Sequence, residues 1–90
     1  MTRLEYIQKH SSLFWYTPKE KLADISDSFL VETILNYGSL EDVKDLFQVI
    51  GLNHAAKVFF AARGRMKMNY YPEIYNFFSI VFNRYAQGNS

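Results

Sequence analysis

The stretch SLEDVKDLFQVIGLNHAAKVFFAA, residues 39–62, decides how the rest of this chain can fold. Apolar residues recur at every third or fourth position on both sides of Gly51, which is the spacing of an amphipathic helix. Ser39 begins a capping sequence of the form Ser-x-x-Asp, and Gly51 is typical of a residue that ends a helix. The stretch therefore predicts two helices joined at Gly51, a helix–turn–helix in the loose geometric sense.

Helices are also predicted on both sides of this hairpin. Residues 2–9 suit one short helix capped by Thr2, and residues 28–37 suit a longer helix capped by Ser26 or Asp27. Gly38 is expected to stop that helix in the left-handed conformation. The last helix spans about residues 72–85, and its apolar stripe is the clearest in the chain. The predicted core stripes are Phe29, Leu30, Ile34 and Tyr37, then Leu40, Val43, Leu46, Phe47 and Ile50, then Leu52, Ala55, Ala56, Phe59 and Ala62, then Ile74, Phe77, Phe78, Val81, Phe82 and Tyr85.

The predicted fold class is all-α, because no stretch shows the sustained alternation of a half-buried strand. Ninety residues are enough for one domain and too few for two. We expect a compact bundle of four main helices plus a short N-terminal helix, in one domain over residues 1–90. Within it, residues 1–12 form an N-terminal helix or arm, and residues 86–90 form a frayed tail.

The run LFWY at residues 13–16 is too short to interpret by periodicity. Because Pro18 follows closely, the run is expected to be extended, as an aromatic plug that places Phe14 or Trp15 in the core. Thr17 is expected to cap a short turn over residues 18–23, with Pro18 at its first helical position. Whether Trp15 belongs to the core or to an interface is left open.

Composition limits the setting in which the chain works. It has no Cys, which excludes disulfides and thiolate zinc sites and fits a reducing cytoplasm. The first ten residues lack the apolar run of a signal peptide, and no uninterrupted run of 18 apolar residues is present. We therefore expect a cytoplasmic protein without a membrane partner.

Charge is unevenly distributed although the net charge is only +1. Residues 1–45 contain five Lys or Arg and eight Asp or Glu, whereas residues 46–90 contain five Lys or Arg and one Glu. Such an asymmetry indicates an anionic partner for the C-terminal half. Opposite faces that attract one another across a homodimer explain it equally well.

No pattern of residues indicates catalysis, a metal site or a cofactor. His10 and His54 lie far from one another in the sequence, so the helical metal-pair spacing is absent. Glu41, Asp42 and Asp45 crowd the start of a predicted helix, where negative charge is favourable, so we interpret them as capping residues. The glycines are too widely spaced for a phosphate-binding loop. The expectation is a protein that is not an enzyme and needs no cofactor.

Nucleic-acid binding is the alternative reading of residues 39–62. Basic residues in and after the second helix could contact phosphates. Against groove recognition, Phe47 stands where a small residue is usual before the turn glycine, and Lys57 stands where a core residue is usual after it. The candidate nucleic-acid contacts are Lys57, Arg63, Arg65 and Lys67.

Protein binding is the leading functional hypothesis, because aromatic residues make up 18% of the chain. A domain of this size cannot easily bury so much aromatic surface, so part of it should meet a protein partner or a second copy of the chain. The candidate partner contacts are Trp15, Tyr16, Tyr70, Tyr71, Tyr75 and Ile80.

Several segments agree in order with a family of small bacterial and archaeal proteins without an assigned activity. The chain resembles that family in LFW at 13–15, PxxKL at 18–22, VExxLxYGSLED at 31–42 and LFxxxG at 46–51. It departs at Tyr16, where the family often has Asp, and at residues 77–78, where Phe-Trp is common. The resemblance implies an antitoxin-like partner of a nucleotidyltransferase-type toxin. It also implies structural roles for Phe14, Trp15 and the Tyr37-Gly38 corner.

Overall fold

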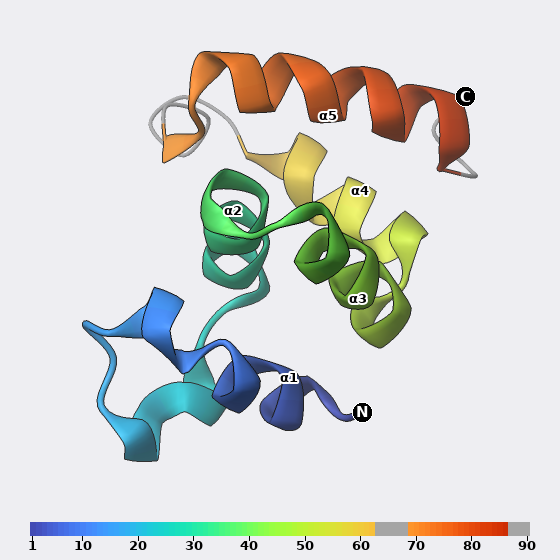
Figure 1. Ribbon diagram of the computed structural model, residues 1–90. Coiled ribbons are helices and arrows are strands. Elements are labelled where there is room, and N and C mark those ends of the chain that lie inside the picture. The colour runs from blue at the N-terminus through green and yellow to red at the C-terminus, as the bar shows by residue number, and fades with distance from the viewer. Residues whose placement is uncertain (63–68, 87–90) are drawn as a thin grey trace.

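The computed structural model describes residues 1–62 and 69–86, and every regular element in these two segments is helical (Figure 1). The all-α prediction is confirmed, as are the four main helices and the short N-terminal one. None of the helices in the described segments has the length and the hydropathy that a bilayer crossing requires. The elements are α1 (Arg3–Lys9), the 3₁₀ helices η1 (Ser11–Phe14) and η2 (Lys19–Asp24), α2 (Asp27–Tyr37), α3 (Leu40–Ile50), α4 (Leu52–Ala61) and α5 (Pro72–Tyr85).

Short polar residues fix where three of these helices begin. Thr2 and Glu5 bond reciprocally in a capping box, through Glu5 N–H to Thr2 Oγ1 at 3.2 Å and Thr2 N–H to Glu5 Oε1 at 2.8 Å. Ser39 and Asp42 form the same box at the start of α3. Ser26, rather than Asp27, caps α2 and accepts the Phe29 N–H at 3.1 Å. The local sequence thus determines these boundaries.

The two helix-ending glycines serve different purposes. Gly51 has φ +91°, a conformation that favours glycine, and it alone separates α3 from α4. Gly38 has φ −79° and ψ 162°, so the predicted left-handed conformation is wrong. Glycine is needed there for space, because a Cβ would lie 2.8 Å from the Ile34 carbonyl oxygen.

The elements form successive layers (Figure 1). α5 lies across one side of the molecule, α1 and the two 3₁₀ helices lie at the opposite side, and α2, α3 and α4 fill the space between them. α2 contacts both α3 and α4, and α4 contacts α5. The radius of gyration is 12.6 Å, close to the value of about 12 Å that the size law gives for a packed chain of this length.

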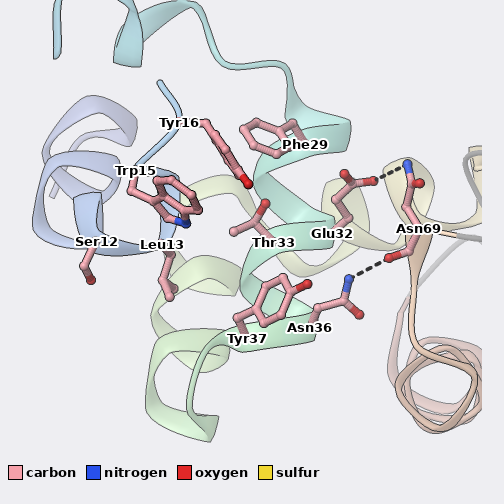
Figure 2. A pocket seen from close by; sticks show the side chains of 10 residues that line it. All are labelled: Ser12, Leu13, Trp15, Tyr16, Phe29, Glu32, Thr33, Asn36, Tyr37 and Asn69. Atoms are coloured by element: carbon pink, nitrogen blue, oxygen red, sulfur yellow. Dashed lines mark hydrogen bonds between the residues drawn. The ribbon is translucent and has the colours of Figure 1, made fainter. Parts of the chain in front are cut away.

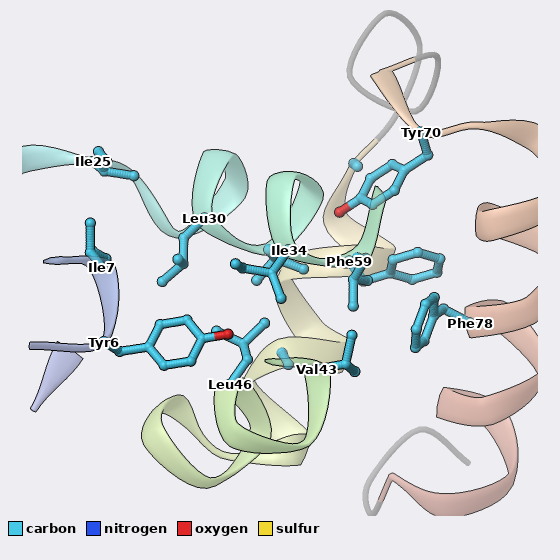
Figure 3. Close-up of a cluster of buried hydrophobic side chains, with 14 of the residues drawn as sticks. Tyr6, Ile7, Ile25, Leu30, Ile34, Val43, Leu46, Phe59, Tyr70 and Phe78 are labelled. Atoms are coloured by element: carbon cyan, nitrogen blue, oxygen red, sulfur yellow. The ribbon is translucent and has the colours of Figure 1, made fainter. Parts of the chain in front are cut away.

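One hydrophobic cluster runs through all three layers (Figure 3). Tyr6 from α1 and Leu46 from α3 are fully buried on one side of it. Phe59 of α4 lies at the other side, where its ring contacts those of Tyr70 and Phe82 at centroid distances of 5.1 Å. Phe59 therefore connects the central layer to α5.

The outer members of the predicted stripes are exposed rather than buried. α5 turns Phe78 and Phe82 toward the core, and this leaves the neighbouring Phe77 on the solvent side, because successive helical residues differ by about 100°. A surface helix buries only one stripe of its circumference, which is narrower than the predicted sets. The four exposed residues are Tyr37, Leu40, Phe77 and Tyr85.

The LFWY run is not extended, contrary to the prediction. Its first two residues, Leu13 and Phe14, belong to the 3₁₀ helix η1, in which the Leu13 N–H bonds to the His10 carbonyl at 2.9 Å. Pro18 restricts only the residue before it, so the helical turn ends at Thr17, whose N–H bonds to the Phe14 carbonyl at 2.8 Å. Pro18 itself precedes η2 instead of occupying its first position, and no side chain caps that helix.

Candidate binding groove

An open groove of about 540 Å³ follows the outer side of α2 (Figure 2). Its floor is a stripe of α2 side chains at helical spacing, one wall comes from η1 and the residues after it, and the other wall is Asn69. The α2 residues that line it are Phe29, Glu32, Thr33, Asn36 and Tyr37.

Phe14 positions the aromatic wall of the groove. Its side chain is 1% exposed and meets Phe29 edge-on, with ring centroids 5.6 Å apart. Because Phe14 turns inward, Trp15 and Tyr16 turn outward, and their rings stack with centroids 3.7 Å apart. The sequence predicted that either Phe14 or Trp15 lies in the core. Because Trp15 is 71% exposed, the core residue is Phe14. The structural role that the resemblance implied for Trp15 is wrong, since its ring lies over the groove instead of in the core.

Asn36 holds the opposite wall in place. Its Nδ2–H donates to the Asn69 carbonyl at 2.9 Å (Figure 2). Its Oδ1 accepts the Tyr71 N–H at 3.2 Å. Tyr71 also donates its hydroxyl hydrogen bond to Tyr37, with 3.1 Å between the oxygens. The start of α5 is thereby attached to the end of α2, and Tyr37 stands exposed at the rim, not in the core.

Glu32 places a carboxylate at the edge of the groove. Burial raises the pKa of its carboxyl group, and a 3.2 Å hydrogen bond from Asn69 Nδ2–H partly opposes that effect. None of the ion pairs among residues 1–62 and 69–86 involves Glu32. The groove thus combines aromatic faces with a half-buried carboxylate that lacks a cation within the described structure.

The predicted partner contacts separate into exposed and buried groups. Trp15, Tyr16, Tyr71 and Ile80 are exposed, as a contact surface requires. Tyr70 is only 5% exposed, so its assignment as a partner contact is wrong. Its ring packs against that of Phe59 in the core (Figure 3). Tyr70 therefore points inward, although it lies two residues before the start of α5.

Tyr75, another predicted partner contact, is likewise not an exposed residue of α5. It is half-buried and stacks on Phe59 with centroids 4.7 Å apart. Its position, three residues before Phe78, lies on the side of the helix that faces α4. The groove and the outer face of α5 are therefore separate surfaces.

The candidate nucleic-acid contacts are only partly described. Lys57 is exposed on α4, while Arg63, Arg65 and Lys67 lie outside the described residues. α4 contacts both α2 and α5, and Ala55, Ala56 and Phe59 on it are fully buried. Nucleic-acid binding through this segment stays a prediction, and so does the frayed tail, since residues 87–90 also lie outside the described part.

Both histidines have carboxylate partners that the sequence did not reveal. His10 is buried, with Nδ1 at 2.9 Å from the Tyr6 carbonyl and Nε2 at 3.0 Å from Asp42 Oδ1. Both partners are acceptors, so a ring nitrogen that carries a proton has an acceptor within hydrogen-bond distance on either side. The Ser39 N–H, and then His10, lower the pKa of Asp42.

His54 meets Asp27 Oδ2 at 2.8 Å on the surface. Asp27 also pairs with Arg3, and Arg3 donates to the Ile25 carbonyl, so this network joins α1, α2 and α4. The hydrogen bond from His54 is the main cause of the lowered pKa of Asp27. Sequence separations of 27 and 32 residues explain why neither histidine pair could be found from spacing.

The histidines of the chain do not contribute to the groove. The residues that line it include no His, and the two histidines lie in the separate pairs with Asp27 and Asp42. Within the described segments, no three His, Asp or Glu side chains gather as a metal ion would require.

Comparison with protein-family models, with curated proteins and with solved structures found no match. The resemblance to small bacterial and archaeal helical proteins therefore stays a prediction that rests on the quoted motifs. The groove must be interpreted from its own geometry.

Proposed function

We propose that this protein is a non-catalytic interaction domain, whose aromatic groove binds a partner protein through a segment that carries Lys or Arg. The observation that carries the proposal is that Trp15, Tyr16 and Tyr37 line the same groove as the Glu32 carboxylate. An antitoxin-like role, which the resemblance implies, is one narrower form of this function.

The electrostatics of Glu32 support a basic ligand. Burial raises the pKa of this carboxyl group because the ionised form is incompletely solvated. A guanidinium or ammonium group placed beside it would supply a counter-charge that no ion pair among the described residues provides, together with a charge-assisted hydrogen bond. A neutral side chain in the same place would not compensate the charge of the carboxylate, and an acidic side chain would repel it.

The aromatic wall supports the same ligand chemistry. A cation over the face of a Trp or Tyr ring gains about 0.5–2 kcal/mol, and Arg also stacks flat against such rings. Trp15 and Tyr16 already stack on one another, so these two side chains should lose little conformational entropy when a ligand binds. Exposed aromatic rings of this kind are also enriched among the residues that dominate interface energetics.

A peptide selection tests the proposal directly. A random peptide library displayed on phage is selected on the immobilised protein, and the best sequence is synthesised beside a copy with each Lys and Arg changed to Gln. Because Trp15 is the single Trp of the chain, its fluorescence reports occupancy of the groove. We expect selected peptides rich in Lys or Arg, and about tenfold weaker binding both for the Gln copy and for Glu32→Gln.

Two further variants define the site. Trp15→Ala, measured by calorimetry, should also weaken binding, whereas Tyr85→Ala removes an equally exposed aromatic residue from the end of α5 and should not. Peptides without basic residues, or equal affinity for Glu32→Gln, would contradict the proposal. Oligonucleotides that bind the parent but not Trp15→Ala would indicate stacked bases as the ligand instead.

A further inference from the structure

The solvent face of α5 has a stripe of four residues that no other described element covers. Phe77 is 52% exposed and Ile80 is 65% exposed, and the exposed Glu73 and Arg84 lie on the same line of the helix. The successive spacings along the stripe are four, three and four residues. This is the heptad spacing of a coiled-coil seam, with Phe77 and Arg84 at a positions and Glu73 and Ile80 at d positions.

The position of α5 explains why this stripe is free. The helix lies across the outside of the molecule and packs inward on α4 (Figure 1). Phe78 and Phe82 make that inward contact, and the stripe faces the opposite way. Two large apolar side chains exposed in succession on one helix face are typical of a surface that meets another helix.

The stripe is also self-complementary in charge. Glu73 and Arg84 are equally far from the midpoint between Phe77 and Ile80, one toward each end of the helix. When two copies of α5 are placed antiparallel about that midpoint, Glu73 lies opposite Arg84 of the partner subunit, and Phe77 lies opposite Ile80 of the partner subunit. In antiparallel coiled coils a positions meet d positions in this way. A parallel pair would place like charges together at both ends.

The ion pairs of the described segments leave the two charged residues of the stripe unused. Among residues 1–62 and 69–86, neither Glu73 nor Arg84 takes part in an ion pair. No described residue thus holds either side chain in an ion pair, and across a two-fold axis the Glu73–Arg84 pair would occur twice.

We propose that the outer face of α5 is a self-recognition surface that binds a second copy of this chain, antiparallel, through Glu73, Phe77, Ile80 and Arg84. The proposal is independent of the groove on α2. A contact between two single helices involves far fewer residues than the roughly 20–30 on each side of a stable interface. We therefore expect a weak dimer, with a Kd of about 10 µM to 1 mM.

Charge reversal tests both the contact and its orientation. Sedimentation equilibrium is measured between about 5 µM and 2 mM for the parent, Glu73→Arg, Arg84→Glu and the double variant, a range that spans the expected Kd. Each single variant replaces two attractive pairs with two repulsive ones and should weaken association about tenfold or more. The double variant restores both pairs and should associate like the parent. An equimolar mixture of the two single variants should form a heterodimer.

The apolar centre of the seam has its own variant. Ile80→Asp leaves both charge pairs in place and should still abolish association, whereas Asn76→Asp, which adds the same charge to α5 outside the four-residue stripe, should have a smaller effect. All these residues are exposed, so thermal transitions at about 5 µM should agree within a few degrees. A parent that stays monomeric at 2 mM, or single reversals that associate as well as the parent, would overturn the proposal.

Discussion

Adjacent residues 14 and 15 offer a sharp test of the structure. Phe14 is 1% exposed and Trp15 is 71% exposed, although both are large aromatic residues in one short run. Truncation of a buried Phe to Ala costs about 3–5 kcal/mol, because contacts are lost and a cavity remains. We therefore expect Phe14→Ala to remove a large share of the stability of a domain of this size, for which about 5–13 kcal/mol is usual.

The cost for Trp15 follows from the surface that it buries. A Trp side chain offers up to about 250 Å², of which less than a third is covered here, so roughly 70 Å² is lost on truncation. At about 25 cal/mol per Å², this sets an upper bound of about 2 kcal/mol for Trp15→Ala. The smaller residue of the pair should therefore be the more costly to remove.

Urea denaturation followed by far-UV circular dichroism measures both variants against the parent. The midpoint should fall much further for Phe14→Ala than for Trp15→Ala, with similar m-values. Because this signal comes from helix content, loss of the single Trp does not remove the probe. Equal costs, or a larger cost for Trp15→Ala, would mean that Trp15 belongs to the core and that the groove is misplaced.

Three other perturbations have expected outcomes. Gly51→Ala should cost about 1–3 kcal/mol in the same urea assay, because φ +91° is strained for alanine. Asn36→Ala should lower the free energy of unfolding by about 1 kcal/mol. It should also speed amide hydrogen exchange at Tyr71, because the Tyr71 N–H loses its acceptor on Asn36 and becomes exposed to water. The pKa values of Asp27 and Asp42 are lowered in the folded state, so their contribution to stability is present above pH 4 and is lost as pH falls through the lowered pKa values. Asp42→Asn should show a smaller loss between about pH 4 and pH 2 than the parent, and an equal loss would exclude Asp42 as a source of it.

Local signals in the sequence were sufficient for most of the helix boundaries. Thr2 and Ser39 act on residues only three positions away, so their capping boxes are readable directly from the sequence. The predicted last helix, about residues 72–85, agrees with α5 (Pro72–Tyr85) because Pro72 starts it and its apolar repeat is regular. These features do not depend on what the rest of the chain does.

The face that each aromatic residue presents could not be read in the same way. Phe14 and Trp15 have similar hydrophobicity, and only the position of α2 decides which of them turns inward. Tyr70 likewise packs against Phe59, with ring centroids 5.1 Å apart, although its position just before α5 does not identify it as a core residue. An aromatic residue at the edge of an apolar stripe fits the helical spacing whether it is buried or exposed, so the spacing does not predict its burial.

The groove itself was beyond the reach of sequence patterns. Its floor comes from α2 and its walls from residues 12–16 and Asn69, and the hydrogen bonds that join α2 to Asn69 span more than 30 residues. Glu32 and Asn36 do share a helix face, being four residues apart, which is a signal that could have directed attention to this side of α2. Nothing in the sequence indicates that both bond to Asn69.

The single-residue junction at Gly51 also limits how the chain can change in length. An inserted residue there would rotate α4 by about 100° relative to α3 if the inserted residue continued either helix. That rotation would carry Ala55, Ala56 and Phe59 out of the core together. Insertions and deletions in descendants of this sequence should therefore avoid residue 51 and collect between η1 and η2, where residues 15–18 belong to no helix.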